Sequence, residues 1–331
     1  MFSWMIGIIL LTLILWVALR RIPISGLISH PNPVSNYEEA LVRVKAMQEE
    51  DNNDFTRDVC ITKLFDHGTQ TEHVIVLLHG FTNCPEQFSE LGKRFFDAGF
   101  NVFIPRMPYH GLNDRLTNDL LKLTAEDLCV FGDKVLDIAH GLAKKVSVMG
   151  ISGGGNVAAW LAQNRTDLDF AFPIAAFFGL NSIPAWLMNF FVRLGLIMPN
   201  FFMWWDPRTK AENPQSIYYA YPRYPIRAMM EIFRLGTAIK AQADKIPPAA
   251  QNIVMIINDA ESSVNNPELS KLIETWQTHH KETLNEYHFK KSLKLPHDLI
   301  TPNPAILSVE ESYPRLIQLV KNTHANLQKN V

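Results

Sequence analysis

Cysteine is scarce in this sequence, with three residues, Cys60, Cys84 and Cys129, among 331. Small domains that depend on disulfides contain many more cysteines, and zinc sites need cysteine or histidine pairs at short, regular spacings. The three scattered cysteines fit neither pattern. We therefore predict three reduced thiols in or near the core, with no disulfide framework and no metal site.

An excess of charge of either sign is also missing. The formal net charge is −2, and 19% of the residues are charged. Nucleic-acid-binding proteins usually have a strongly basic surface, so a nucleic-acid partner is not expected. The hydrophobic fraction is 47%, and the chain is long enough to bury a full core in one large domain or two small ones.

Charged side chains are absent from Met1 to Leu19, and Arg20 and Arg21 follow at once. A helix of about 20 apolar residues spans a bilayer. A signal peptide would need a basic start and a cleavage site of small residues, and a buried core helix is a further alternative. We predict a single transmembrane anchor over residues 1–21, with the membrane as a partner. The arginine pair then places the following domain on the cytoplasmic side.

Strands and helices alternate through most of the remaining chain. Apolar runs predict strands over residues 60–65, 73–79, 100–105, 145–149, 169–177, 253–257 and 282–289. Periodic and capped segments predict helices over residues 36–50, 85–98, 124–141, 156–163, 267–280 and 306–327. This alternation is typical of a doubly wound, mostly parallel α/β sheet, in which ligands bind at the carboxyl ends of the strands.

One segment, residues 180–248, interrupts this alternation. It is dense in Trp, Phe and Tyr and contains no clear strand. We predict a helical insertion that covers the active-site edge of the sheet. The predicted organisation is then the anchor over residues 1–21, a linker and helix over 22–59, and the α/β domain over 60–331.

A serine lies between the strand at 145–149 and the helix at 156–163, in the segment Gly150 to Gly154 with the sequence G-I-S-G-G. A serine hydroxyl is a weak nucleophile unless it is exposed, rigidly held and close to a base. A sharp G-x-S-x-G turn between a strand and a helix holds it in that way. Ser152 is therefore the candidate nucleophile.

His79 and Gly80 follow a buried strand directly and turn the chain there. Acyl transfer needs N–H donors for the negatively charged oxygen of the intermediate. We assign this oxyanion hole to the backbone N–H groups of Phe81 and of Gly153, the residue after the candidate nucleophile. The side chain of His79 is expected to brace the loop.

The catalytic base is expected to be a histidine that follows Ser152 in the sequence, because the triad order in this architecture is serine, acid, histidine. His297 lies in a loop between the last strand and the last helix, where its ring can reach Ser152. The other candidates lie in or at the ends of predicted helices and strands: His279, His280, His288 and His324. The acid should follow the strand at 253–257, where both Asp259 and Glu261 are available.

Four motifs occur in a characteristic order: His79-Gly80-Phe81-Thr82 with Pro85, residues 105–111, the Ser152 turn and Pro296-His297-Asp298. With them the chain resembles the α/β-hydrolase superfamily, in the branch of carboxylesterases and monoacylglycerol lipases, over about residues 60–325. The resemblance implies that Glu261 takes the place of the acid ahead of Asp259, although Asp is usual there. It also implies that residues 180–248 form a cap and that His110 is structural.

Together these observations predict a membrane-anchored serine hydrolase of carboxylic esters that acts through an acyl-enzyme, with no metal or organic cofactor. The aromatic cap suggests a lipid-like ester such as a monoacylglycerol. Thioester hydrolysis, acyl transfer and peptide cleavage on the same triad are alternatives. A catalytically silent, membrane-tethered binding module is an alternative of another class.

Overall fold

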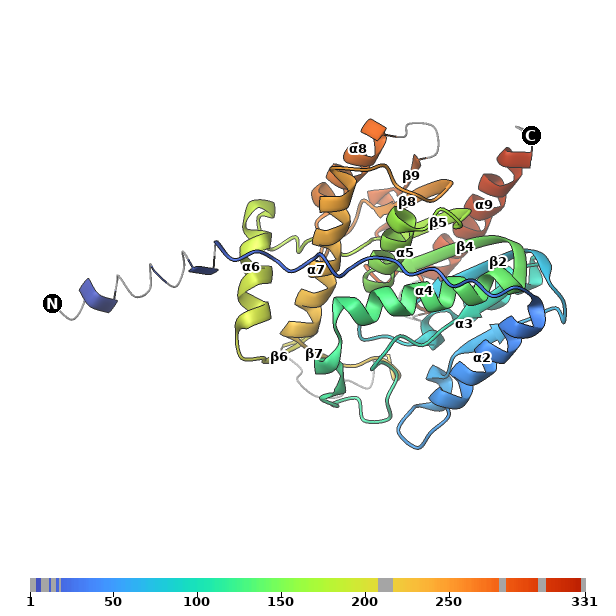
Figure 1. Ribbon diagram of the computed structural model, residues 1–331, viewed down its shortest axis with the longest axis horizontal. Coiled ribbons are helices and arrows are strands. Elements are labelled where there is room, and N and C mark those ends of the chain that lie inside the picture. The colour runs from blue at the N-terminus through green and yellow to red at the C-terminus, as the bar shows by residue number, and fades with distance from the viewer. Residues whose placement is uncertain are drawn as a thin grey trace.

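The computed structural model describes residues 4–6, 12, 16–17, 19–207, 217–279, 284–302 and 308–328. Within these residues the centre is a seven-stranded sheet of order β1-β3-β2-β4-β5-β8-β9 (Figure 1). Every strand pair in it is parallel except β1 with β3, which confirms the predicted α/β architecture. The strands are β1 (Lys63–Phe65), β2 (Thr71–Leu78), β3 (Asn101–Ile104), β4 (Ala143–Ile151), β5 (Phe170–Ile174), β8 (Asn252–Asn258) and β9 (Leu284–Phe289).

Helices cover both faces of the sheet. Successive residues of a strand point to opposite faces, so in β2 Val74 and Val76 belong to one apolar cluster and Ile75 to the other. Helices α3 and α9 pack into the second cluster, and the other large helices pack into the first. The helices of the sheet domain are α2 (Tyr37–Asp51), α3 (Ser89–Asp97), α4 (Ala125–Leu142), α5 (Gly153–Asn164), α8 (Asn266–His279) and α9 (Ser308–Gln328).

Two of these helices start where their sequences predict. The side chain of Asn36 accepts a hydrogen bond from the backbone N–H of Glu39 and caps α2. At α4, Thr124 and Asp127 each bond to the other's backbone N–H in a capping box. The strand predicted over 60–65 is partly wrong, since Asp58–Cys60 form a 3-10 turn, η1, and only Lys63–Phe65 join the sheet.

The insertion leaves the sheet after β5 and returns at β8, two strands that are neighbours. It contains α6 (Ala185–Ile197) and α7 (Ile226–Ala243), which pack together (Figure 1). It also contains β6 (Phe202–Trp204) paired antiparallel with β7 (Arg223–Pro225), so the prediction of an insertion without strands was wrong. Strands of this length are too short to produce a recognisable alternation in the sequence.

Residues 22–35, which lead into α2, lie across α4 and α5 (Figure 1). Leu27 is fully buried, and its carbonyl accepts a hydrogen bond from the indole of Trp160. Asp133 accepts from the Ser29 hydroxyl and from the backbone N–H of His30. These contacts fix the segment that leads to the N-terminus.

No helix within the described part of the chain is both long enough and apolar enough to cross a membrane. Most of the anchor predicted over residues 1–21 lies outside that part. The anchor therefore stays a prediction.

Candidate active site

Ser152 lies at a sharp turn between β4 and α5. Its backbone has φ 55° and ψ −116°, a conformation that serine rarely adopts. A Cβ atom on Gly150 would lie 2.2 Å from the carbonyl oxygen of Gly154, and one on Gly154 would lie 2.2 Å from that of Leu78. Only glycine fits at both positions, which explains the G-x-S-x-G pattern and fixes the serine.

The proposed oxyanion donors come from two segments that meet at this turn. Gly153 is the first residue of α5, and the first N–H groups of a helix have no partner within it and carry its partial positive charge. A Cβ on Gly153 would lie 3.2 Å from the backbone nitrogen of Phe81. The structure thus brings Phe81 and Gly153, the two residues predicted as oxyanion donors, close together beside Ser152.

Two histidines close to the loop after β2, His79 and His110, are structural. His79 Nε2 accepts from the Met107 backbone N–H at 3.1 Å, so Nδ1 carries the proton and donates to the Gly80 carbonyl at 3.0 Å. Burial lowers the pKa of His79 well below its ordinary value. His110 donates from Nδ1 to the Pro108 carbonyl, and burial lowers the pKa of His110 to about 4. Both rings are neutral braces, as expected.

His297 and Glu261 form a direct hydrogen bond. Glu261 Oε2 accepts from His297 Nδ1 at 2.6 Å, and the Glu261 side chain is fully buried. This bond leaves Nε2 of His297 as the ring nitrogen available to a hydroxyl. Burial alone would lower the pKa of His297, but the Glu261 hydrogen bond and the negative charge of Asp298 outweigh it and raise the pKa.

The Glu261 carboxylate is held on its other side by the backbone. Its Oε1 accepts from the N–H groups of Ser262, Ser263 and Val264 at 2.9, 2.6 and 3.3 Å. Burial would raise the pKa of Glu261, but the hydrogen bonds from His297 and from this backbone lower it overall. The acid is therefore ionised and fixed toward the imidazole.

Asp259 binds a different histidine. Its Oδ1 lies 2.8 Å from Nδ1 of His288, and both side chains are exposed. His279 contacts the Ala243 carbonyl, and His324 contacts Ser147 inside the fold, where burial lowers the pKa of His324 to about 3. His280 lies outside the described residues. Among the histidine candidates, the described part of the chain places only His297 on the cavity that contains Ser152.

That cavity has a volume of about 440 Å³ and lies between the sheet and the insertion. Its polar lining includes Ser152 and His297, and most of the rest is apolar and aromatic. The insertion and its flanks supply Leu180, Trp204, Trp205, Ile217, Tyr221, Tyr224 and Met229. The predicted insertion therefore does cover the site.

The insertion also binds residues 79–84, the loop after β2 that carries the proposed donor Phe81 and is called the oxyanion loop below. Thr82, which has φ 67°, accepts a hydrogen bond at Oγ1 from the indole of Trp205 at 2.9 Å. Its carbonyl accepts from the Tyr221 backbone N–H at 2.8 Å. The rings of Trp205 and Tyr224 lie 4.2 Å apart at their centroids, and both contact Phe81 edge-on.

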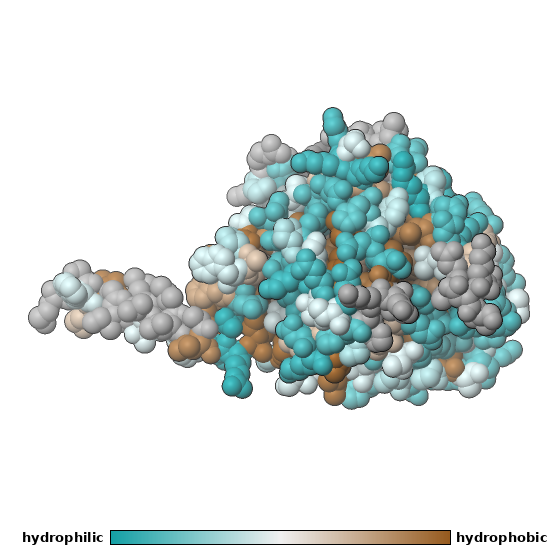
Figure 2. All heavy atoms as spheres, turned by 90° about the horizontal axis from the view of Figure 1, so that it is seen from above, coloured by the Kyte–Doolittle hydropathy of each residue, from teal (hydrophilic) through white to brown (hydrophobic). Residues whose placement is uncertain are grey.

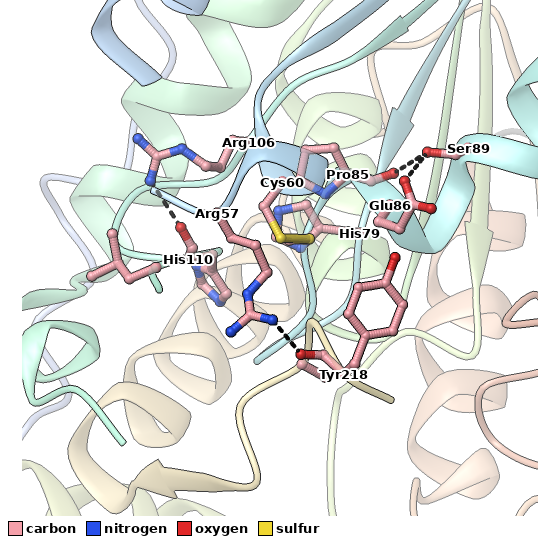
Figure 3. The surroundings of a disulfide bond; sticks show 12 residues. Arg57, Cys60, His79, Pro85, Glu86, Ser89, Arg106, His110 and Tyr218 are labelled. Carbon is pink, nitrogen blue, oxygen red and sulfur yellow. Dashed lines mark hydrogen bonds between the residues drawn. A yellow bond between two sulfur atoms is a disulfide. The ribbon is translucent and has the colours of Figure 1, made fainter. Parts of the chain in front are cut away.

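A disulfide joins Cys60 to Cys84, so the prediction of three reduced thiols was wrong for two of them. The bond ties η1 to the end of the oxyanion loop, close to His79 and Pro85 (Figure 3). A separation of 24 residues gives no signal in the sequence, and only the fold brings the two segments together. Cys129 is free and buried, and burial raises the pKa of its thiol.

This disulfide argues against the predicted cytoplasmic location of the domain, because disulfides persist mainly in oxidising compartments.

Asn258 was also not identified from the sequence as a residue of the site. From the end of β8 its buried amide donates to the carbonyls of Leu295 and Pro296, which fixes the loop that carries His297. A single amide at a strand end has no distinctive sequence signal.

The fold and the strained serine turn define an α/β hydrolase. Residues 69–288 match the Hydrolase_4 family, described as serine aminopeptidase, S33, and the chain belongs to this family. It is similar to the thermostable monoacylglycerol lipase of Bacillus sp. (strain H-257), with 25% identity over 172 residues. That match covers 52% of this chain and 65% of the relative, which is less than two thirds of the relative's length.

Solved structures share the fold. The monoacylglycerol lipase of Paleococcus ferrophilus aligns with a TM-score of 0.59 at 16% identity, covering 79% of this chain and 98% of that one. A soluble variant of the monoglyceride lipase of Saccharomyces cerevisiae aligns with a TM-score of 0.57 at 11% identity, covering 79% and 92%. At these identities the likeness is one of fold alone.

Proposed function

We propose that the protein hydrolyses carboxylic esters through an acyl-enzyme on Ser152. The observation that carries this proposal is the Glu261–His297 hydrogen bond at the edge of the cavity that also contains Ser152. A buried acid bonded to a histidine that shares a cavity with a strained serine is the arrangement that nucleophilic acyl transfer requires. The match to a family of serine hydrolases supports the same reaction class.

In this mechanism His297 Nε2 takes the proton of Ser152 as Oγ attacks the ester carbonyl. The N–H groups of Phe81 and Gly153 stabilise the oxyanion of the tetrahedral intermediate. His297 then gives its proton to the departing alkoxide, which leaves as the alcohol, and the acyl group remains on Ser152. Water repeats the sequence, losing a proton to His297, and releases the carboxylic acid and the free serine.

The substrate we propose is lipid-like, such as a monoacylglycerol. The cavity wall is mainly apolar, and the similar proteins named above include monoacylglycerol lipases. Hydrophobic residues are also exposed around the insertion, including Trp186, Phe201 and Trp205 at 79%, 47% and 50%. Figure 2 shows apolar surface at the end of the domain where Figure 1 places α6. Such a surface suits contact with lipid and fits the proposed membrane partner.

The test is turnover of p-nitrophenyl esters of graded chain length by the full-length protein in mild detergent, together with labelling by a fluorophosphonate. Ser152→Ala is the control and should fold normally, without turnover or labelling. Turnover with labelling at Ser152 supports the serine esterase, and a long-chain optimum supports the lipid-like substrate. Near-normal turnover by the Ser152→Ala variant would remove Ser152 from the mechanism.

The family description also names an aminopeptidase, so aminoacyl p-nitroanilides belong in the same assay. Labelling of Ser152 with amide turnover and no ester turnover would reassign the protein to peptide cleavage on the same residues. Folded protein with neither labelling nor turnover would favour a silent binding module.

A further inference from the structure

Gln87 is a fully buried polar residue that the mechanism above does not use. It lies in a 3-10 turn, η2 (Pro85–Phe88), directly after the oxyanion loop, and its exposed fraction is 0%. Burial of an amide is costly unless its oxygen and nitrogen both find partners. The partners of Gln87 lie on two separate catalytic loops.

The first partner is the oxyanion loop. Gln87 Oε1 accepts from the backbone N–H of Gly80 at 2.8 Å. Gly80 immediately precedes Phe81, whose N–H group is a proposed oxyanion donor. The bond therefore fixes the peptide unit next to that donor.

The second partner is the loop of the catalytic histidine. Gln87 Nε2 donates to Asp298 Oδ1 at 3.3 Å and to Thr301 Oγ1 at 3.1 Å. Asp298 directly follows His297. The amide has one possible orientation, because the Gly80 N–H can only donate and the Asp298 oxygen accepts.

The backbone of Gln87 is itself held rigidly. Its N–H donates to the Cys84 carbonyl at 3.0 Å, and Cys84 is joined to Cys60 by the disulfide. Pro85 occupies the first position of the turn, where its fixed φ suits a helical start. The side chain thus extends from a fixed point to both loops.

We propose that Gln87 is a positioning residue that sets the oxyanion donor and the catalytic histidine relative to each other. This inference rests on the serine-esterase function proposed above. Displacements of about 1 Å between reacting groups cost on the order of a hundredfold in rate. A side chain that bonds to both loops limits such displacements without touching the substrate.

The test is Gln87→Met in the full-length protein, which keeps the length of the side chain and removes all three hydrogen bonds. We expect kcat to fall by about ten- to a hundredfold while KM changes by less than about twofold. The rate of fluorophosphonate labelling should fall in parallel, because it depends on the same serine, histidine and oxyanion donors.

The matched control is Gln163→Met. Gln163 is also buried, at 1%, and makes three hydrogen bonds, accepting from the Trp276 indole and donating to the Ile246 and Pro247 carbonyls. It is far along α5 from the serine turn. We expect this variant to lose stability but to keep the wild-type kcat. Equal kcat values for the two variants, corrected for the folded fraction, would overturn the proposal.

Gln87→Glu is a second variant, which keeps one of the hydrogen bonds that Gln87→Met loses. It keeps an acceptor toward Gly80 but places a carboxylate oxygen against Asp298. We expect a lower kcat whose ratio to the wild-type value rises as the pH falls, because protonation of either carboxyl relieves the repulsion. A wild-type kcat at all pH values would overturn the role. If the wild-type protein neither labels nor turns over esters, the proposed function fails and the positioning role fails with it.

Discussion

Glu261 accepts a 2.6 Å hydrogen bond from the ring of His297, while Asp259, two residues earlier, pairs with His288 on the surface. Both carboxylates follow the same strand, and the sequence leaves either able to orient His297. The difference is geometric. Glu261 turns inward, and three backbone N–H groups hold its other oxygen, whereas the Asp259 side chain is 38% exposed.

We expect Glu261→Gln to lower kcat by several orders of magnitude and Asp259→Asn to change it by less than about twofold. Replacing the triad acid by its amide in a serine protease costs about 10⁴, since the imidazole loses its orientation and the charge that stabilises it. Steady-state kinetics on one p-nitrophenyl ester, with circular dichroism as a check on folding, measures both variants. A larger loss from Asp259→Asn would reassign the acid.

The pH dependence of kcat/KM should reflect the raised pKa of His297. Only the neutral imidazole can accept a proton, and interactions with Glu261 and Asp298 raise its pKa above the ordinary 6.5 despite burial. We therefore expect kcat/KM to fall as the pH drops through a value above 6.5. Asp298→Asn removes one of the raising charges, so the midpoint should move to lower pH. An unchanged or higher midpoint in that variant would contradict this explanation.

The fold follows closely from local patterns, because β2 contains a continuous apolar run from Val74 to Leu78 and helices such as α4 begin at a recognisable cap. The serine turn is equally local, since Gly150 and Gly154 are required by backbone contacts within a few residues or on the adjacent strand. The features that could not be predicted from the sequence depend on contacts between segments that are far apart in the chain. The Cys60–Cys84 bond, the β6–β7 pair and the contacts of Gln87 with Asp298 all join positions with no local signal.

The requirement for glycine at position 154 can be tested by measuring the free energy of unfolding. A Cβ on Gly154 would lie 2.2 Å from the Leu78 carbonyl oxygen and 2.5 Å from that of His79, and neither backbone can move without disturbing the sheet. We expect Gly154→Ala to lower the free energy of unfolding by about 3 kcal/mol or more. Gly26→Ala is the control, because the nearest atom there is 3.9 Å away, and it should change stability by less than about 1 kcal/mol. Urea unfolding measures both, and a Gly154→Ala protein of wild-type stability would show that the turn relaxes.

The disulfide predicts which of the three cysteines carry free thiols in the cell. If the domain works in an oxidising compartment, Cys60 and Cys84 are bonded there, and only Cys129 carries a thiol. Cells that produce the full-length protein are quenched with acid, and the protein is then denatured and treated with a maleimide of high mass. We expect one maleimide to be added per chain. Reduction before the treatment should give three. Three additions without reduction would show that the bond is absent in the cell and would restore the cytoplasmic location.

The cavity wall should select for acyl-chain length. Trp205 lines the cavity and lies against Tyr224 with its ring tilted, so a long acyl chain placed there would lose an aromatic contact in Trp205→Ala. Loss of such a contact is worth about 1.5 kcal/mol, or roughly a tenfold rise in KM for a dodecanoate ester. The Trp205–Thr82 hydrogen bond is lost for every substrate alike, so the ratio of dodecanoate to acetate kcat/KM isolates the contact with the chain. Phe55→Ala removes an aromatic side chain that is 76% exposed, lies outside the insertion and does not line this cavity, and it should leave the ratio unchanged. Equal ratios in the two variants would place the acyl chain elsewhere.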